Sequence, residues 1–422
     1  MCERFAFYIM MAILVLFLSA KFGLTGGQAG IIYSVFYFSI FVLTIVGGVI
    51  ADKIRNHRGT VFVGLISMAA GYFIIAIPTP VSVSSGLFLT LICLGLFVIA
   101  FGNGLFKGNL QAMIGQMYDD PKYSKMRDEG FSLSYIFLNI SVLLAPLVVY
   151  AVNYLELGFH YAFAISVFAM AISLSIYWLN EKKLPTPKTM EVYAIKMDIK
   201  EVRQRLYVLL FVFLVLNLFY FAFYQNGLTL TLFARDYANL NDIGLDTRAL
   251  QSINPLFVIL LMPILLLIFS ILRKRDKEPS TTKKMAIGMG IAAVAFVVMA
   301  LGSIGLPDFK TVMHQGCLSD AERVTPFLLI GTYFTLTLAG LFLAPLGISF
   351  VSKVSPPKYQ GLMQSLWMGG ASIGNSLLFL GMMLYEQIPI WTMWTVFATV
   401  CLLSMIIMLL MMKWVEKHGL KK

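Results

Sequence analysis

The sequence predicts an all-α membrane protein with twelve transmembrane helices in two six-helix halves. Of its 422 residues, 59% are hydrophobic and only 13% are charged, whereas soluble domains are near half apolar and about a quarter charged. The mean hydropathy is +0.83. No segment alternates polar and apolar residues with a period of two, so a membrane β-barrel is not expected. The composition therefore excludes an ordinary water-soluble globular fold.

Twelve apolar stretches are long enough to cross a bilayer, because a helix needs about 20 residues to span roughly 30 Å of hydrocarbon. Their interiors are rich in Leu, Ile, Val, Phe and Met, and membrane helices tolerate the Gly and Pro residues among them. The first stretch has no basic head or clear cleavage site, so it is not expected to be a signal peptide. The stretches lie at 5–22, 28–51, 60–78, 86–114, 130–152, 160–180, 206–233, 252–272, 285–303, 326–351, 361–384 and 391–412.

A hydrophilic segment separates the first six stretches from the last six. The predicted organisation is therefore 1–180 as the N-terminal half, 181–205 as a cytoplasmic linker and 206–422 as the C-terminal half. Two repeated halves with a site between them near the midplane are typical of secondary transporters. The mixed charges of the linker indicate a solvated tether, which is too short for further spanning helices.

Basic residues are concentrated in one set of connections between the stretches. With both termini on the inside, the outer set contains few of the 32 Lys and Arg residues, namely Lys21, Arg235, Arg248, Lys310 and Arg323. The positive-inside rule then predicts cytoplasmic termini. The net charge of +11 is explained in this way without nucleic acid as a partner. We expect a multi-pass protein of the plasma membrane or of a bacterial inner membrane.

Three charges fall inside the apolar stretches: Glu3, Arg4 and Lys107. Lys107 is roughly 18 Å of helix away from Asp119, the next loop carboxylate, so its ammonium cannot easily reach water. Such a charge costs about 2.5 to 3.5 kcal/mol on insertion scales, which suggests a functional role. Neighbouring side chains on a helix diverge, so Glu3 and Arg4 are not expected to face each other.

The segment GGVIADKIRNHRG, residues 47–59, resembles the GGxxADRxxGxRR motif of the major facilitator superfamily. This motif joins the second and third helices of that fold. Gly47 and Gly48 are expected to let helices approach closely. The resemblance implies the major facilitator fold and says little about the substrate.

The charged part of the same motif is predicted to form a cytoplasmic latch. Asp52 lies close in sequence to Lys53 and Arg58, which can pair with it. His57 lies between the two bases, in what the hydropathy predicts to be a loop. We interpret it as a solvated loop histidine.

Six further segments, in order along the chain, resemble motifs of the proton-dependent oligopeptide transporter family. They are ERFAFY (3–8), GNGLFKGN (102–109), SYIFLNIS (134–141), FYQNGLTLTLFA (223–234), QSINPLF (251–257) and SPPKYQGLMQSLW (355–367). The resemblance runs along the whole chain, and the chain resembles a divergent member of this family. It implies proton-coupled uptake of di- and tripeptides or peptide-like carboxylates by alternating access, at a polar cavity between the halves.

The resemblance also implies roles for individual residues. Glu3 would belong to the proton-coupling group, and Lys107 would meet the substrate carboxylate or pair with an acid. The other candidates for substrate binding are Arg4, Tyr8, Tyr37, Asn139, Tyr224, Asn254 and Trp367. From the residues alone, the two asparagines can equally be hydrogen-bond links between helices, and Tyr8, Tyr37 and Trp367 are packing residues.

Three positions depart from the family pattern. Tyr224 replaces the glutamate of helix 7, and Met11 replaces its partner arginine in helix 1. The glutamate and the arginine are expected to be lost together, because either one alone would be an unpaired buried charge. Gly340 replaces the glutamate of helix 10. Lys107 thereby loses one expected partner, and Glu3 is the acid that can approach it across helices 1 and 4.

The membrane interior is left with one more cation than anions, which favours a substrate with a carboxylate and does less for an amine. We therefore expect weakened selection for a peptide's amino terminus. The alternatives are a carrier of another organic anion and a substrate-binding sensor that no longer cycles.

The first apolar stretch is short for a spanning helix. Residues 5–20 form only about 24 Å of helix, against a hydrocarbon core of roughly 30 Å. The first glutamate of the family motif would also precede Met1. We expect a start further upstream; the alternative is the loss of the cytoplasmic part of this helix, which would favour a scaffold or non-transporting role.

Enzymatic chemistry is not expected. The cysteines at 2, 93, 317 and 401 have no metal-ligand spacing, and there is no GxxxxGK[ST] phosphate-binding sequence. We expect no metal and no cofactor, with protons as the coupling ion. The expected partners are a small-molecule peptide or carboxylate substrate and the lipid bilayer, and we expect the protein to work as a monomer.

Overall fold

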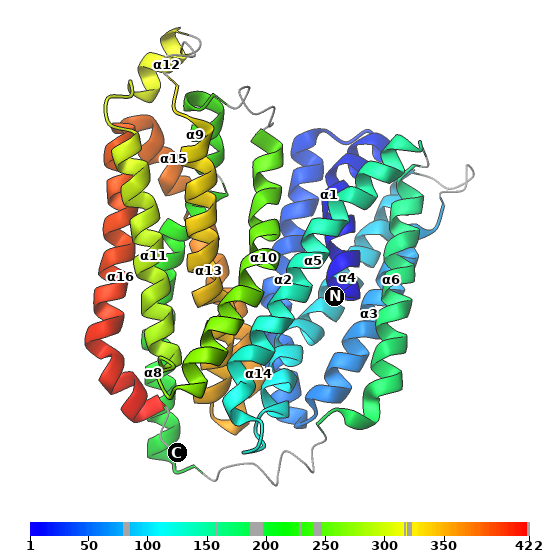
Figure 1. Cartoon of the computed structure of the whole chain (residues 1–422). Helices are drawn as coiled ribbons and strands as arrows, with labels where there is room; N and C mark the ends of the chain where they lie inside the picture. The colour runs from blue at the N-terminus through cyan, green and yellow to red at the C-terminus, as the bar shows by residue number, and fades with distance from the viewer. Residues whose placement is uncertain are drawn as a thin grey trace. The chain divides into compact units, whose positions relative to one another are not determined.

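The computed structural model describes residues 1–78, 85–156, 158–185, 197–227, 229–239, 247–315, 318 and 323–419. Within these ranges the regular secondary structure is helical (Figure 1). One isolated parallel bridge joins Ala238 to Val324. The prediction of an all-α protein is confirmed.

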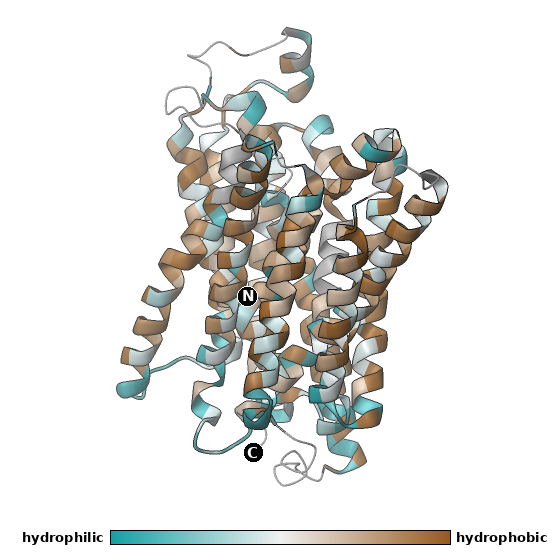
Figure 2. Cartoon of the chain, turned by 90° about the vertical axis from the view of Figure 1, so that its right-hand side faces the viewer, coloured by the Kyte–Doolittle hydropathy of each residue, from teal (hydrophilic) through white to brown (hydrophobic). Residues whose placement is uncertain are grey.

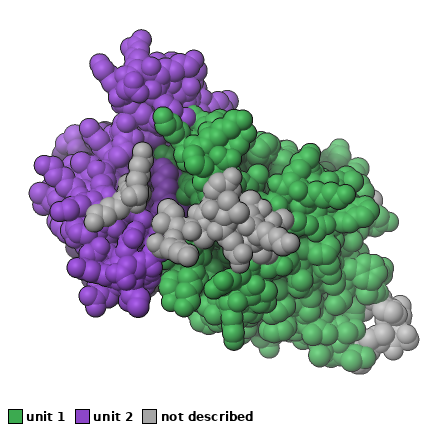
Figure 3. All heavy atoms as spheres, turned by 90° about the horizontal axis from the view of Figure 1, so that it is seen from below, with its two compact units in different colours: residues 1–196, 355–369 green, residues 197–354, 370–422 purple. Residues whose placement is uncertain are grey.

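The chain forms two compact units (Figure 3). Unit 1 comprises Met1–Lys196 and Ser355–Gly369, and unit 2 comprises Met197–Val354 and Gly370–Lys422. The first boundary lies within the segment 181–205 that the sequence marks as a linker. The short segment Ser355–Gly369 belongs to unit 1 although it follows most of unit 2 in the chain.

Unit 1 contains the helices of the N-terminal half and the first part of one later helix. The long helices are α1 (Cys2–Phe22), α2 (Gly26–Ile54), α3 (His57–Ala76), α4 (Ser85–Met117), α5 (Arg127–Tyr154) and α6 (Phe159–Asn180). Short 3-10 turns, η1 (Ser124–Met126) and η2 (Glu181–Lys183), flank them. The later part consists of η5 (Pro357–Tyr359) and the start of α14 (Gln360–Ser376).

Helices α2, α3 and α4 approach each other closely through glycines. A Cβ on Gly64 of α3 would lie 2.7 Å from the carbonyl oxygen of Gly102 on α4, and the reverse contact would be 2.6 Å. Gly47 of α2 meets the backbone of Gly104 on α4 in the same way. The helix backbones touch because no side chain separates them, as is common for helices packed in membranes.

The core helix of unit 1 is α1, most of whose inward residues are fully buried. Two hydroxyl groups fix its backbone to the neighbouring helices. Ser166 of α6 donates to the carbonyl oxygen of Ala6 at 3.2 Å, and Ser141 of α5 donates to that of Met1 at 2.9 Å. The start of α1 is therefore held between α5 and α6.

Unit 2 contains the remaining helices. They are α8 (Ile199–Phe223), α9 (Thr229–Tyr237), α10 (Thr247–Lys274), α11 (Thr281–Gly302), α12 (Phe309–Gln315), α13 (Pro326–Val354), α15 (Leu378–Gln387) and α16 (Ile390–Gly419), with the 3-10 turn η3 (Tyr224–Asn226) after α8. Part of its core is an aromatic cluster around Trp394 of α16, which is fully buried. The Trp394 ring lies 5.6 Å from that of Phe233 on α9 and 6.0 Å from that of Phe296 on α11.

Eleven helices in the described part of the chain are long and apolar enough to cross a membrane. Hydrophobic residues dominate along them, and hydrophilic residues gather at helix ends and in connections (Figure 2). They coincide with eleven of the predicted stretches. The remaining stretch, 361–384, is two helices, because α14 ends at Ser376 and α15 begins at Leu378. A hydropathy window cannot detect such a break, since it sums side-chain character and ignores the backbone path.

The turn between α10 and α11 contains a charged cluster. Glu278 accepts hydrogen bonds from Arg273 Nε and Lys284 Nζ, each at 2.6 Å. The side chain of Lys284 is 1% exposed, and its ammonium lies 4.3 Å from the ring centroid of Phe269. Burial raises the pKa of Glu278, but the hydrogen bonds and charges of Arg273 and Lys284 outweigh burial and hold that pKa below its ordinary value.

Candidate functional site

A buried carboxylate lies at the contact of α1 with α4. The side chain of Glu3 is 3% exposed, and its Oε2 lies 2.8 Å from Nε of Arg4. Asn103 of α4, which is fully buried, donates to Glu3 Oε1 at 3.3 Å. The prediction that Glu3 and Arg4 diverge is wrong. The flexible arginine stem folds back to the carboxylate, because an unpaired buried charge is costlier than a constrained side chain.

The guanidinium of Arg4 also lies over two aromatic rings. Its Cζ is 5.7 Å from the ring centroid of Phe7 on α1 and 6.0 Å from that of Phe106 on α4. These cation–π contacts add to the attraction of the carboxylate. Tyr8 makes an edge-to-face contact with Phe7 at 5.7 Å and so lies beside the same group.

Lys107 follows Asn103 by four positions on α4, so the two side chains point to the same helix face. Its ammonium lies 5.4 Å from the ring centroid of Phe41 on α2. Among the residues that the structure describes, it has no ion-pair partner. Glu3 therefore contacts α4 through Asn103 and not through Lys107, and the ammonium is left available for an anion.

Aromatic side chains of α2 continue from the Lys107 contact. Phe41 makes an edge-to-face contact with Tyr37 at 5.0 Å, and Tyr37 stacks on Tyr33 at 6.3 Å. Tyr37 is 39% exposed. The structure thus brings Glu3 and Lys107, with the aromatic residues that the sequence proposes beside them, to neighbouring positions on α1, α2 and α4.

The two asparagine candidates take different partners. Asn139 of α5 donates to the carbonyl oxygen of Tyr135 in its own helix at 2.9 Å. Asn254 of α10 accepts a hydrogen bond from the hydroxyl of Thr337 on α13 at 3.0 Å. Asn254 therefore makes the link between helices that was one of its two predicted roles.

The aromatic candidates of the later chain lie on other elements. Tyr224 begins η3 in unit 2 and stacks on Tyr220 with ring centroids 5.1 Å apart. Trp367 lies on α14, in the part that belongs to unit 1, and is 6% exposed.

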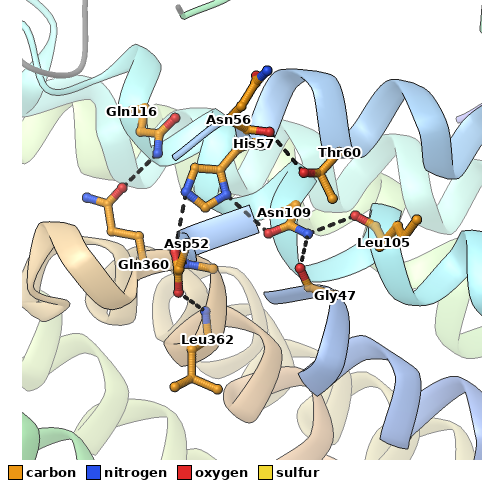
Figure 4. A network of polar contacts seen from close by, with 11 residues as sticks. Gly47, Asp52, Asn56, His57, Thr60, Leu105, Asn109, Gln116, Gln360 and Leu362 are labelled. Carbon is orange, nitrogen blue, oxygen red and sulfur yellow. Dashed lines mark hydrogen bonds and ion pairs between the residues drawn. The ribbon is translucent and has the colours of Figure 1, made fainter. Parts of the chain in front are cut away.

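A second polar network joins the end of α2 to the start of α14 (Figure 4). Asp52 accepts hydrogen bonds from the backbone N–H groups of Gly361 and Leu362, both at 2.8 Å. The first turn of a helix leaves such N–H groups without partners inside the helix, and they attract negative charge. Asp52 thus binds the positive end of α14.

The predicted pairing of Asp52 with the neighbouring bases is wrong. Arg58 pairs with Glu181 of η2 instead, and the side chain of Lys53 is exposed. Backbone N–H groups carry no signature in the sequence, so this partner of Asp52 could not be read from the motif. A Cβ on Gly48 would lie 2.6 Å from the carbonyl oxygen of Gly361, which explains why a residue without a side chain lies at that position of α2.

The interpretation of His57 as a solvated residue is also wrong, since it is only 2% exposed. Arg55 adopts the left-handed conformation, with φ 56°, and Asn56 caps α3 through Gly59 N at 2.9 Å. This tight turn directs His57 inward. Its Nδ1 lies 3.1 Å from Asn109 Oδ1 on α4, and its Nε2 lies 3.4 Å from Asp52 Oδ1.

Sequence reasoning missed Asn103 as a residue of the site. It also did not predict that His57 contacts Asp52 and Asn109. The position of Asn103, one helical turn before Lys107, was a usable signal. His57 and Asn109 are far apart in the chain, and nothing in the sequence links them.

A cavity of about 550 Å³ opens beside the first residues of α1. It is lined by Met1 and Cys2, by Tyr118 directly after α4, and by side chains of α4, α5 and α6, among them Ser134 and Phe137. Its lining is mostly apolar. None of the predicted substrate-binding residues is part of its lining.

Long apolar helices that bury an ion pair and a lysine ammonium define the class of a multi-pass membrane carrier, because such charges are retained inside membranes for transport or coupling. The chain belongs to the POT family, whose model matches residues 58–189 and 180–394. The family resemblance is thereby confirmed, and the protein is a transporter-family member and not an enzyme.

Curated relatives are similar over most of the chain. A peptide transporter of Yersinia enterocolitica is 28% identical, covering 89% of this chain and 84% of the relative. A di-/tripeptide transporter of Lactococcus lactis subsp. cremoris is 25% identical, covering 86% and 83%. An uncharacterized transporter of Bacillus subtilis is 27% identical, covering 99% and 92%.

Solved structures share the fold. A crystal structure of a peptide transporter in complex with sulfate has a TM-score of 0.65 and 23% identity, covering 100% of this chain and 94% of that one. A POT family transporter in complex with 5-aminolevulinic acid has a TM-score of 0.65 and 20% identity, covering 98% and 94%. The predicted fold class, that of the major facilitator transporters, is confirmed.

Proposed function

We propose that this protein takes up di- and tripeptides or peptide-like carboxylates together with protons, by alternating access. The observation that carries the proposal is the group at the α1–α4 contact. A buried carboxylate, Glu3, is held by Arg4 and Asn103. One turn further along α4 lies Lys107, whose ammonium has no acid partner among the described residues. The peptide transporters among its relatives support the substrate class.

Glu3 is the proposed proton-binding residue. A carboxylate that is paired with a cation stays ionised, and it binds a proton when the cation moves away in a dry environment. A movement of Arg4 that breaks the contact at 2.8 Å would therefore couple proton binding to a conformational change.

Lys107 is the proposed anchor for the substrate carboxylate. Its ammonium is held over the Phe41 ring, which attracts the cation without neutralising it. Arg4, Tyr8 and Tyr37 are proposed to shape the same polar region. Asn139, Tyr224, Asn254 and Trp367 remain proposed contributors, with Asn254 also linking α10 to α13.

The orientation and surroundings are also proposals. The distribution of Lys and Arg supports cytoplasmic termini in a plasma or bacterial inner membrane. Protons are the proposed coupling ion, with no further cofactor, and a monomer in the lipid bilayer is the proposed working unit.

The test is uptake by the full chain in proteoliposomes. A panel of labelled di- and tripeptides is presented with and without an inward proton gradient. We expect accumulation only with the gradient, and its collapse when a protonophore is added. Equal uptake with and without the gradient would contradict coupling. Binding without any net flux would indicate a sensor that does not cycle.

A carrier of other organic anions is the second candidate. It is favoured by the ammonium of Lys107, which is available for an anion, and by Gly340 of α13, a position without a side chain where the family pattern has an acid. Uptake of a dipeptide is compared with that of its N-acetylated form. Equal transport of both supports the wider anion class, and a strict requirement for the free amine excludes it.

A further inference from the structure

The hydrogen-bond network at the start of α14 fixes the orientation of one amide. Asn109 Nδ2 donates to the carbonyl oxygens of Gly47 at 2.9 Å and Leu105 at 2.8 Å. An amide nitrogen has two hydrogens, and both are used by these bonds. A flipped amide would place oxygen against two carbonyl oxygens. Asn109 Oδ1 must therefore be the atom that faces His57.

This orientation determines where His57 carries its first proton. Asn109 Oδ1 only accepts, so His57 Nδ1, at 3.1 Å, must donate to it. The other ring nitrogen, Nε2, faces Asp52 Oδ1 at 3.4 Å. In a neutral imidazole with hydrogen on Nδ1, Nε2 has a lone pair. Without another proton, this lone pair would point at a carboxylate oxygen.

In its ionised form, the Asp52 carboxylate has no hydrogen to donate to Nε2 of His57. Each of its oxygens accepts one backbone hydrogen bond from the first turn of α14. Its side chain is 7% exposed and that of His57 is 2% exposed. Two buried lone pairs facing each other are unfavourable, since neither is hydrated. One proton between Nε2 and Oδ1 converts the repulsion into a charge-assisted hydrogen bond.

We propose that His57 and Asp52 form a proton-binding site, separate from Glu3, that is complete only when α14 is docked on Asp52. One proton is held between Nε2 and Oδ1 while the N–H groups of Gly361 and Leu362 bind the carboxylate. Undocking of α14 hydrates both groups and releases this proton to water. Acidification therefore stabilises the docked arrangement, and a rise in pH favours undocking.

The surrounding groups do not supply this proton. On α3, Arg58 is paired with Glu181. On α2 and the following turn, Lys53 and Arg55 are exposed. On α4 and α14 the nearest polar side chains are neutral, with Gln116 donating to Gln360 at 2.8 Å. The remaining charges of these elements are the exposed Lys358 of η5 and Lys107 of α4, whose ammonium lies against the Phe41 ring.

The experiment measures the docking of α14 directly. Spin labels are placed at Lys53 and Lys358, both exposed, in a full chain whose cysteines are replaced by serine, reconstituted in lipid nanodiscs. The distance distribution is recorded across a pH series. We expect the short-distance population to grow as pH falls, with the docked-to-undocked ratio changing by at most about tenfold per pH unit, as coupling to one proton requires.

Two variants and two controls make the result specific. His57→Gln can donate to Asp52 without titrating, so its distance distribution should be independent of pH. Asp52→Asn can donate to Nε2 and should also lose the pH dependence. Arg55→Asn, an exposed control that tolerates the left-handed turn, should keep it. Glu3→Gln should keep it as well, which separates this site from the proposed proton coupling of transport.

A distribution that does not change with pH in the otherwise unmodified labelled chain would overturn the proposal. The proposal also fails if His57→Gln keeps the full pH response while remaining folded, with folding measured by gel filtration and thermal unfolding.

Discussion

Gly340 of α13 lies directly against the ring of Phe223 at the end of α8. A Cβ on Gly340 would be 3.1 Å from Phe223 Cζ, which is tighter than ordinary van der Waals contact. The ring thus occupies space where the family pattern expects a glutamate side chain. The loss of that acid and the presence of this ring are two parts of one local arrangement.

Gly340→Ala is therefore expected to be neutral or destabilising, although alanine is better than glycine in a helix by about 1 kcal/mol. Overpacking against the ring costs about 1 to 3 kcal/mol. Gly331→Ala on the same helix, where a Cβ would meet nothing within 4 Å, is the control and should raise the melting temperature. Equal stabilisation by both substitutions would refute the packing argument.

Gly340→Glu should regain selectivity for a free peptide amine only when the ring is also removed, in Gly340→Glu with Phe223→Ala. The measurement is the ratio of free to N-acetylated dipeptide uptake. We expect a larger ratio in the double variant than in either single variant. If the single Gly340→Glu variant shows the full gain, the ring does not obstruct the side chain.

Glu3→Gln should abolish accumulation driven by a proton gradient and spare exchange of labelled for unlabelled substrate. The amide cannot take up a proton, whereas exchange needs only substrate binding and reorientation. Both rates are measured in the same proteoliposomes. Glu386→Gln, an exposed acid, serves as control. Gradient-driven uptake that is unchanged in Glu3→Gln would remove Glu3 from the coupling mechanism.

Asn103→Leu should lower uptake driven by a proton gradient more than it lowers exchange of labelled for unlabelled substrate. The amide donates a hydrogen bond to the Glu3 carboxylate at 3.3 Å, and a hydrogen bond to a charged group is worth about 1.5 to 3 kcal/mol. Asn217→Leu on α8, whose amide bonds to its own helix at 2.8 Å, is the matched control. An unchanged ratio of gradient-driven uptake to exchange would show that Asn103 only packs against its neighbours.

Lys107→Ala should selectively weaken the binding of substrates that carry a carboxylate. Loss of a charged hydrogen bond corresponds to roughly 10- to 150-fold in affinity. Competition by a dipeptide is compared with competition by its C-terminal amide. The wild type should prefer the free carboxylate, and the variant should bind both alike. Persistent preference in the variant would place the anion anchor elsewhere.

The Glu278 cluster predicts a component of stability that depends on pH. Because the pKa of Glu278 is held below its ordinary value, this component is complete above about pH 4.3, the ordinary glutamate value. It is lost as pH falls through the lower value of the folded state. Thermal unfolding of Glu278→Gln across pH 3 to 6 should lack this component.

The same cluster can be tested by a double-mutant cycle. Glu278→Gln leaves the buried ammonium of Lys284 with a weaker partner, at a cost of roughly 1 to 3 kcal/mol after discounting for partial exposure. Adding Lys284→Met should recover part of the loss. A double variant that is less stable than the sum of its parts would argue against charge burial as the cause.

The apolar stretches were predictable because bilayer thickness dictates their length, whatever their exact packing. The break between Ser376 and Leu378 was not, since it is a property of the backbone path. The sequence alone shows when a charge lies inside an apolar stretch, and this is how Glu3, Arg4 and Lys107 were found. Their partners were not, since Asn103 is neutral and resembles any other small polar residue.

His57 shows the limit of local reasoning most clearly. Its neighbours in sequence are charged and polar, which predicts exposure. Its neighbours in space come from α2, α4 and, through Asp52, α14. Burial was decided by the turn at Arg55 and by helix contacts that no short segment encodes.

The assignment of residues 355–369 to unit 1 has a consequence for assembly. A fragment that ends at the linker lacks the segment whose N–H groups bind Asp52, and the complementary fragment carries that segment without its binding place. During synthesis, the contact of Asp52 with this segment therefore forms only after residue 362 has been made, when most of the chain already exists. Each half of the chain thus depends on the other for this contact.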